Sequence, residues 1–194
     1  MSAKVLLGFA ATALLATALT AHAATPEDDA DIGVNVRQHG NRIAVDVDIP
    51  VKATAIEAWN VITDYDNMPK FVTSLQSSKV LERNGNTVIL YQKGVASRGP
   101  LSITFENIRE IVLTPPTQIQ SRLISGDLEE SDFTTHVVDH GDSSRIVNHG
   151  EFIPKMWVPP IIGPMLIEAE TRTQFQELRA EIMRRRAEAA TARQ

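Results

Sequence analysis

The chain has 194 residues, with 24 acidic and 19 basic side chains, a formal net charge of −5 and no cysteine. Its acidic and basic residues are interspersed, which argues against binding to nucleic acid. The lack of cysteine excludes a disulfide framework and thiol chemistry, so an apolar core must supply the stability. The length fits one domain.

Residues 1–23 have the pattern of a cleaved export signal. Lys4 provides a positive start, and the apolar run from Val5 to Leu19 is too short to span a bilayer comfortably. Ala21-His22-Ala23 has the small-x-small pattern of a cleavage site. We expect cleavage after Ala23 and a periplasmic or secreted protein, with an uncleaved membrane anchor as the alternative.

The next segments predict a loose leader, a strand and two short helices. Residues 24–42 begin with acidic residues and a proline, and we expect them to form a loose N-terminal segment. Apolar and polar residues alternate from Ile43 to Ile49, which predicts a half-buried strand. Thr54 and Glu57 have the spacing of a capping box, so a helix is expected to begin there. A further helical turn, broken near Pro69, is expected to follow.

Turn signals divide residues 78–152 into a series of strands. Asn84-Gly85 favours a tight hairpin that would pair Leu81 with Val88 and Val80 with Ile89. The other turn signals are Arg98-Gly99-Pro100, Pro115-Pro116, Gly126-Asp127 and Gly141-Asp142.

The strand that begins at Leu101 has an irregular pattern. Leu101, Ile103 and Phe105 alternate, but the apolar phase then shifts to Ile108 and to Ile111-Val112. We interpret this shift as a β-bulge that bends the strand.

The last hairpin is predicted to pair residues 133–138 with residues 145–152. Phe133, Asn148 and Phe152 then share one face, and His136, His149 and Glu151 share the other. Two imidazoles and a carboxylate could bind zinc. Exposed polar residues on the solvent side of a sheet are the favoured interpretation, so we predict no metal ion and no cofactor.

A long helix is expected after Pro164, because no further proline or glycine follows and helix-forming residues dominate. Its apolar stripe also carries Thr171 and Gln174, which reach either the edge of the stripe or a cavity. Arg184-Arg185-Arg186 is expected to be solvated charge at the helix end, with contact to anionic headgroups as the alternative. Residues 187–194 are expected to be a disordered tail. The stripe consists of Ile167, Thr171, Phe175, Leu178 and Ile182.

Together these elements predict an α+β fold. A curved antiparallel sheet of about seven strands, with two short helices after the first strand, needs its apolar face covered, and the C-terminal helix is long enough to lie across it. A bent sheet that grips one helix leaves a space between them, and an apolar space is the usual form of a small-molecule site.

Residues 50–66, with Met68-Pro69 and Phe71-Val72, resemble the opening of START-like domains of the SRPBCC superfamily. The resemblance is closest to the polyketide cyclase/dehydrase and lipid transport group, which includes coenzyme Q-binding START-like proteins. Residues 78–81, 126–128 and the crossover at 154–164 agree with it. The resemblance covers roughly residues 43–183 and implies a helix-grip, Bet v 1-like domain, to which we assign residues 43–186.

The resemblance also implies a hydrophobic cavity that holds a lipid, quinone or polyketide-like ligand. It transfers no set of catalytic residues. The export signal departs from the family's intracellular members, which puts a respiratory-quinone role inside the cell in doubt. We predict eleven ligand-binding residues: Phe71, Phe105, Leu123, Phe133, Asn148, Phe152, Ile167, Thr171, Gln174, Phe175 and Leu178.

Three functions stay open at this point. The favoured one is a binding protein for a hydrophobic small molecule, with possible transient contact to a membrane surface and no prediction of oligomeric state. A cyclase or dehydratase is the second, and a protein-interaction module with a filled interior is the third. The acidic residues Asp127, Glu129, Glu130 and Asp132 could supply an acid/base pair, although a solvated turn explains them equally. Arg98 or Arg122 could anchor a ligand if either points inward.

Overall fold

The computed structural model describes residues 32–98 and 101–193, so the predicted export signal lies outside the described residues. The chain forms one antiparallel sheet of eight strands, a short α-helix, a 3-10 helix and a long C-terminal helix. The elements are β1 Gly33–His39, β2 Arg42–Val51, α2 Ala55–Ile62, η1 Tyr65–Lys70, β3 Leu75–Asn84, β4 Thr87–Arg98, β5 Leu101–Thr114, β6 Gln118–Gly126, β7 Leu128–Asp139, β8 Ser144–Pro154 and α3 Ile162–Thr191.

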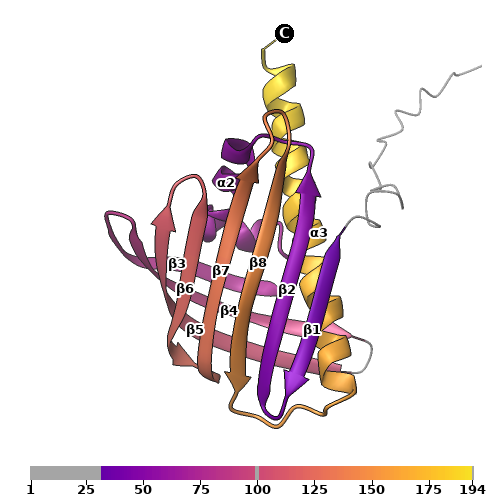
Figure 1. Cartoon of the computed structure of the whole chain (residues 1–194). Coiled ribbons are helices and arrows are strands. Elements are labelled where there is room, and N and C mark those ends of the chain that lie inside the picture. Colours follow the sequence, from indigo (N-terminus) through magenta and orange to yellow (C-terminus); the bar gives the residue numbers. More distant parts are fainter. Residues whose placement is uncertain (1–31, 99–100, 194) are drawn as a thin grey trace, which may run out of the picture.

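The strand order is β1-β2-β8-β7-β6-β5-β4-β3, with β1 and β3 at the two edges. In Figure 1, β3, β4 and β5 cross the view while β1, β2 and β8 run along it, so the sheet is strongly curved. Helix α3 lies along the inner side and packs against β1, β2, β4 and α2. The predicted helix-grip fold is confirmed.

The edge strand β1 was not expected. Its residues fall in the stretch predicted to be loose, yet they pair with β2, with Val34 opposite Val47 and Val36 opposite Val45. Arg37 donates to the Asp46 carboxylate at 2.6 Å across the hairpin. The alternation in β1 spans only two valines, which stay half-buried, so its hydrophobic signal is weak.

The strands that form the inner face match the predicted alternation. Ile43, Val45, Val47 and Ile49 of β2 are all buried. In the β7–β8 hairpin, Phe133 lies opposite Gly150, Thr135 opposite Asn148 and Val137 opposite Ile146. The predicted faces of this hairpin are therefore confirmed. The inner-face positions on these strands are the starting point for the site.

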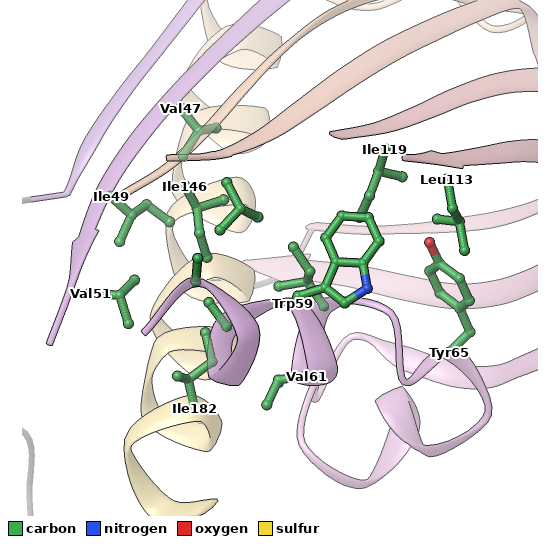
Figure 2. Packing of buried hydrophobic residues seen from close by; sticks show 14 of the residues in the cluster. Val47, Ile49, Val51, Trp59, Val61, Tyr65, Leu113, Ile119, Ile146 and Ile182 are labelled. Carbon is green, nitrogen blue, oxygen red and sulfur yellow. The ribbon is translucent and has the colours of Figure 1, made fainter. Parts of the chain in front are cut away.

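Part of the buried core lies at one end of the sheet, where α2 and the C-terminal half of α3 meet it (Figure 2). The predicted capping box is present, because Thr54 accepts from the Glu57 backbone and the Glu57 carboxylate accepts from the Thr54 backbone. Figure 2 shows Trp59 and Tyr65 on the side of α2 and η1 that faces the sheet. Ile182 is the α3 residue that joins this fully buried cluster.

The predicted register of β3 and β4 is wrong. Val80 pairs with Leu90 and Glu82 with Ile89, because Leu81 is the extra residue of a bulge and is exposed. The bulge predicted in β5 is found at the expected place, but on the neighbouring strand, because the pairing of β5 with β4 is continuous. The irregularity lies between β5 and β6, after Ile108, and the extra residue belongs to β6.

Two arginines of the run, Arg185 and Arg186, dock α3 rather than serving as solvated charge, while Arg184 pairs with Glu181 and Glu188 of the same helix. Arg185 donates to Asp64 at 2.8 Å and to the buried Glu181 at 2.7 Å. Arg186 donates to the backbone carbonyl oxygens of Lys52 at 2.7 Å and Asp142 at 2.9 Å. The helix continues to Thr191, beyond the residue 186 at which the domain was expected to end. Within residues 32–98 and 101–193, no helix is both long and apolar enough to cross a membrane.

Candidate functional site

The candidate site lies between the inner face of the sheet and the N-terminal two thirds of α3. In α3 the fully buried residues are Gly163, Glu181 and Ile182. The other stripe residues point to the same side as Ile182 by helical spacing but are only half-buried. The predicted stripe is thus packed tightly at one end and loosely along the rest. These half-buried stripe residues are Ile167, Thr171, Phe175 and Leu178.

Polar contacts hold this loosely packed part of α3 at both of its flanks. On one flank, Arg172 donates to the backbone carbonyl oxygen of Ile32 beside β1. On the other, the Glu177 carboxylate accepts from the backbone N–H of Thr73 at 3.0 Å, and Gln174 donates to Ser74 at 3.0 Å. The helix is therefore tied down at its edges, while its sheet-facing apolar side chains stay incompletely covered.

Two phenylalanine rings lie across glycines of the neighbouring strands. Phe133 pairs with Gly150, and a methyl group at Gly150 would come within 2.2 Å of that ring. Phe105 pairs with Gly94, where the corresponding distance is 2.5 Å. Phe133 also stacks on Phe152, with ring centroids 6.3 Å apart. Glycine at these positions lets the rings lie flat on the inner face.

Polar side chains interrupt this apolar surface. Thr135 donates to the Asn148 side-chain oxygen at 2.8 Å, and Asn148 is buried. Gln92 donates to Ser78 at 3.3 Å. Asn107 is also buried, and its side-chain oxygen has no hydrogen-bond partner within the part of the chain that the structure describes. An unpartnered buried oxygen can accept from a ligand or from water.

Arg109 is the residue that the sequence analysis missed. Its guanidinium donates through Nη1 to Ser131 at 3.2 Å and, more weakly, to Ser121 at 3.5 Å. It lies 5.8 Å from the centroid of the Phe133 ring. Burial lowers the pKa of Arg109 to about 10.

The signal for Arg109 was present in the sequence. Phe105, Asn107, Arg109, Ile111 and Leu113 have the same parity, and the structure places this set on the inner face. The apparent shift of the apolar phase was two polar residues at inward positions. Arg122, one of the two arginines considered as an anchor, lies on the outer face and is exposed, and the side chain of the other, Arg98, lies outside the described residues. Its Nε is 3.4 Å from the Asp132 carboxylate.

The structure brings part of the predicted set together. Phe133, Asn148 and Phe152 are neighbours on β7 and β8. Phe71 lies apart near η1, where Arg185 sits 5.4 Å from its ring centroid. Leu123 lies where β6 leaves β7. Six of the predicted residues pack against the core cluster while remaining half-buried, namely Phe71, Phe133, Phe152, Ile167, Phe175 and Leu178.

The outer face of the sheet carries a separate, charged hollow of about 430 Å³. It opens where the β6–β7 pairing ends at Arg122 and Asp132. Its charges are largely paired, with Arg42 bonded to Glu130 at 2.6 Å. His149 lies here too, at 2.5 Å from Asp46. In the part of the chain that the structure describes, no three histidine or carboxylate side chains are grouped to hold a metal ion.

The connection from β8 to α3 and the first turn of α3 expose large apolar side chains. Trp157 and Ile161 keep 77% and 79% of their surface accessible. Apolar residues gathered at such exposure are a usual feature of membrane or protein contact sites. The segment comprises Met156, Trp157, Ile161, Ile162 and Met165.

A curved sheet around a long helix, with incompletely covered aromatic residues between them, defines a helix-grip protein of the START-like class. Residues 51–179 match the family described as Polyketide cyclase / dehydrase and lipid transport, and the chain belongs to that family. No curated protein matches the sequence significantly.

Solved structures of the same fold share little sequence with this chain. A START superfamily protein from Mycobacterium smegmatis has a TM-score of 0.63 and 17% identity, covering 73% of this chain and 97% of its own. The Zhui aromatase/cyclase from Streptomyces sp. R1128 has a TM-score of 0.63 and 13% identity, with 74% and 95% covered. A STAR-related lipid transfer protein from Xanthomonas axonopodis has a TM-score of 0.61 and 8% identity, with 79% and 99% covered. At these identities the likeness establishes the fold alone.

Proposed function

We propose that this protein binds a hydrophobic small molecule, of the lipid, quinone or polyketide type, between the inner face of the sheet and α3. One observation carries the proposal. Aromatic and aliphatic side chains that face the interior remain half-buried, among them Phe133, Phe152 and Phe175. Apolar surface left uncovered inside a fold is stabilised when an apolar ligand removes it from water.

The binding energy would come mainly from this apolar surface. Each Å² removed from water contributes about 25 cal/mol, so covering about 200 Å² would contribute about 5 kcal/mol before the cost of ordering the ligand. We propose that the ligand is oriented by hydrogen bonds to Asn148, Thr171 and Gln174. Gln174 already bonds to Ser74, so it would have to exchange that contact for one to a ligand.

The name of one similar structure supports this proposal, because it is a STAR-related lipid transfer protein. Another similar structure is an aromatase/cyclase. Two acidic residues considered for a cyclase or dehydratase, Glu130 and Asp132, pair with Arg42 and Arg122 on the outer face. These two acidic residues therefore give the enzyme alternative no support, and binding is the function that we propose.

Organic extraction of the purified mature protein, followed by mass spectrometry, is the direct test. We expect a hydrophobic compound in the extract, and saturable uptake of a fluorescent fatty acid by the extracted protein. Phe175→Asp should abolish this uptake, because a carboxylate would enter the apolar space. Ile124→Asp, on the exposed outer side of β6, is the matched control and should leave uptake unchanged.

An empty extract together with no uptake would contradict the proposal and favour an interaction module. Unchanged uptake by Phe175→Asp would show that α3 does not form the wall of the site.

We also propose that the protein is exported, with cleavage after Ala23, as the pattern of residues 1–23 suggests. Cell fractionation and the mass of the mature N-terminus test this directly. A protein recovered in the cytoplasm with its N-terminal segment intact would contradict it.

Transient membrane contact is best supported at the exposed apolar segment around the start of α3. The arginine run is a poorer candidate, because Arg185 and Arg186 are engaged in docking the helix. Trp157 is exposed and Trp59 is buried, so vesicles should shift the fluorescence of Trp157 to shorter wavelength. Trp157→Ala should remove the shift. A spectrum unaffected by vesicles would contradict membrane contact.

A further inference from the structure

Arg109 is a buried cation without a carboxylate partner among the described residues. Its neighbours are the hydroxyl groups of Ser131 and Ser121 and the face of the Phe133 ring. A guanidinium carries five N–H donors, and the bonds to the two serines both use Nη1. Keeping a charge in such surroundings is unfavourable unless something compensates for its lost hydration.

The guanidinium lies on the inner side of the sheet. Arg109 has the same parity on β5 as Asn107 and Ile111, which are both buried, and burial lowers its pKa to about 10. By accessible area the residue is only half-buried, so part of its side chain is not covered by protein. We place that part toward the proposed ligand space between the sheet and α3.

Polar and apolar groups are placed in series around that space. The aromatic pair Phe133 and Phe152 lies on one side of Arg109, and the unpartnered side-chain oxygen of Asn107 lies two residues along the same strand and on the same face. A ligand that meets the aromatic pair with an apolar body can therefore place a polar head against the guanidinium.

We infer that Arg109 anchors the carboxylate head of an amphiphilic ligand whose apolar body lies against Phe133 and Phe152. This inference rests on the proposed function and names its ligand class. A carboxylate matches the planar fork of a guanidinium with two parallel hydrogen bonds, and its single negative charge equals the single positive charge. A phosphate dianion would leave one charge uncompensated, and a neutral carbonyl would leave the cation unpaired.

The test compares two ligands that differ only at the head. Lauric acid, ionised at pH 7, and 1-dodecanol compete for a neutral fluorescent probe, N-phenyl-1-naphthylamine, bound to the wild-type protein. Hydrogen bonds to charged groups contribute about 1.5–3 kcal/mol, so laurate should displace the probe at a concentration at least about tenfold lower. A site without the anchor would prefer the alcohol, because burying an unpaired carboxylate is costly.

Arg109→Met should reverse the preference, weakening laurate at least about tenfold while 1-dodecanol competes as before or better. Arg122→Met removes an arginine from the outer face and is the matched control. In this variant laurate should still displace the probe at a lower concentration than 1-dodecanol. Arg109→Lys keeps the charge but loses the planar fork, so its preference for laurate over 1-dodecanol should lie between those of the wild type and of Arg109→Met.

Equal competition by both ligands in the wild-type protein would overturn the inference and leave the proposed function standing. Since that comparison needs no variant, it decides the point even if Arg109→Met fails to fold. Probe binding that neither ligand reduces would overturn the inference too. A wild-type protein that binds no probe would count against the proposed function, and the inference would fall with it.

Discussion

Replacing Glu181 with glutamine should loosen the docking of the C-terminal half of α3 beside α2. The Glu181 carboxylate is buried and accepts from Arg184 at 2.7 and 2.8 Å and from Arg185 at 2.7 Å. Arg185 in turn reaches Asp64, just before η1. Glutamine keeps the shape but gives up the charge, so the two arginines lose their shared anion.

The expected size of the effect follows from the pKa of Glu181, which its bonds to Arg184 and Arg185 lower from 4.5 to about 2. At about 1.4 kcal/mol per pKa unit this sets an upper bound of about 3 kcal/mol on the stabilisation. Because half of the Arg184 side chain is exposed and screened by water, we expect a loss of about 1–2 kcal/mol. That corresponds to a fall in Tm of about 2–8 °C.

Urea unfolding followed by circular dichroism measures this loss, and its pH dependence checks the cause. A carboxyl group whose folded pKa is lowered stabilises above its unfolded pKa and loses that effect as pH falls through the folded value. The difference in unfolding free energy between wild type and Glu181→Gln should therefore decrease from about pH 5 downward and be nearly zero at about pH 2. A gap that stays constant over this range would refute the electrostatic explanation.

The matched control is Glu188→Gln, which removes an exposed carboxylate from the same arginine, Arg184. An exposed ion pair contributes about 0–1 kcal/mol, so this variant should unfold close to wild type. A loss equal to that of Glu181→Gln would show that burial is not what makes Glu181 important.

Three further changes test the packing around the site. Gly150→Ala should cost about 1–3 kcal/mol and weaken probe uptake, because its methyl group would press on the Phe133 ring; normal uptake and stability would place that ring elsewhere. Thr54→Ala should lower the unfolding free energy by about 1 kcal/mol, since it removes the capping-box partner of Glu57; an unchanged urea midpoint would contradict this. Arg109→Met should be as stable as wild type or more so, because the guanidinium has no carboxylate partner among residues 32–98 and 101–193; a large drop in Tm would mean that Arg109 is structural.

Much of the fold could be predicted because local signals agreed with the tertiary structure. The capping box of Thr54 and Glu57 and the alternation along β2 each have one dominant interpretation, and both are confirmed. The registers of β3 and β4 failed because a bulge at Leu81 changes the face of every later residue. Local patterns do not encode such an insertion, since it is set by how the neighbouring strand curves.

The site was harder to predict than the fold, for a physical reason. An inward polar residue breaks the very alternation that reveals which face is inward, so Asn107 and Arg109 looked like a change of register. Their parity with Phe105 and Ile111 could have identified them, given a sheet position for β5. Conversely, Arg122 was an equally plausible inward residue until its pairing with Asp132 placed it on the outer face.

The two parts of α3 are held in place by different kinds of contact. Its C-terminal half is fixed by Ile182 in the core and by the ion pairs of Glu181 and Arg185. The half that carries Phe175 faces the sheet but is held by polar contacts at its flanks, such as that of Gln174 to Ser74. A helix anchored in this way relies less on complete apolar burial along its first half, where Ile167 and Phe175 pack against the core but stay half-buried. Under the proposed function, this division lets one helix both complete the core and border the ligand.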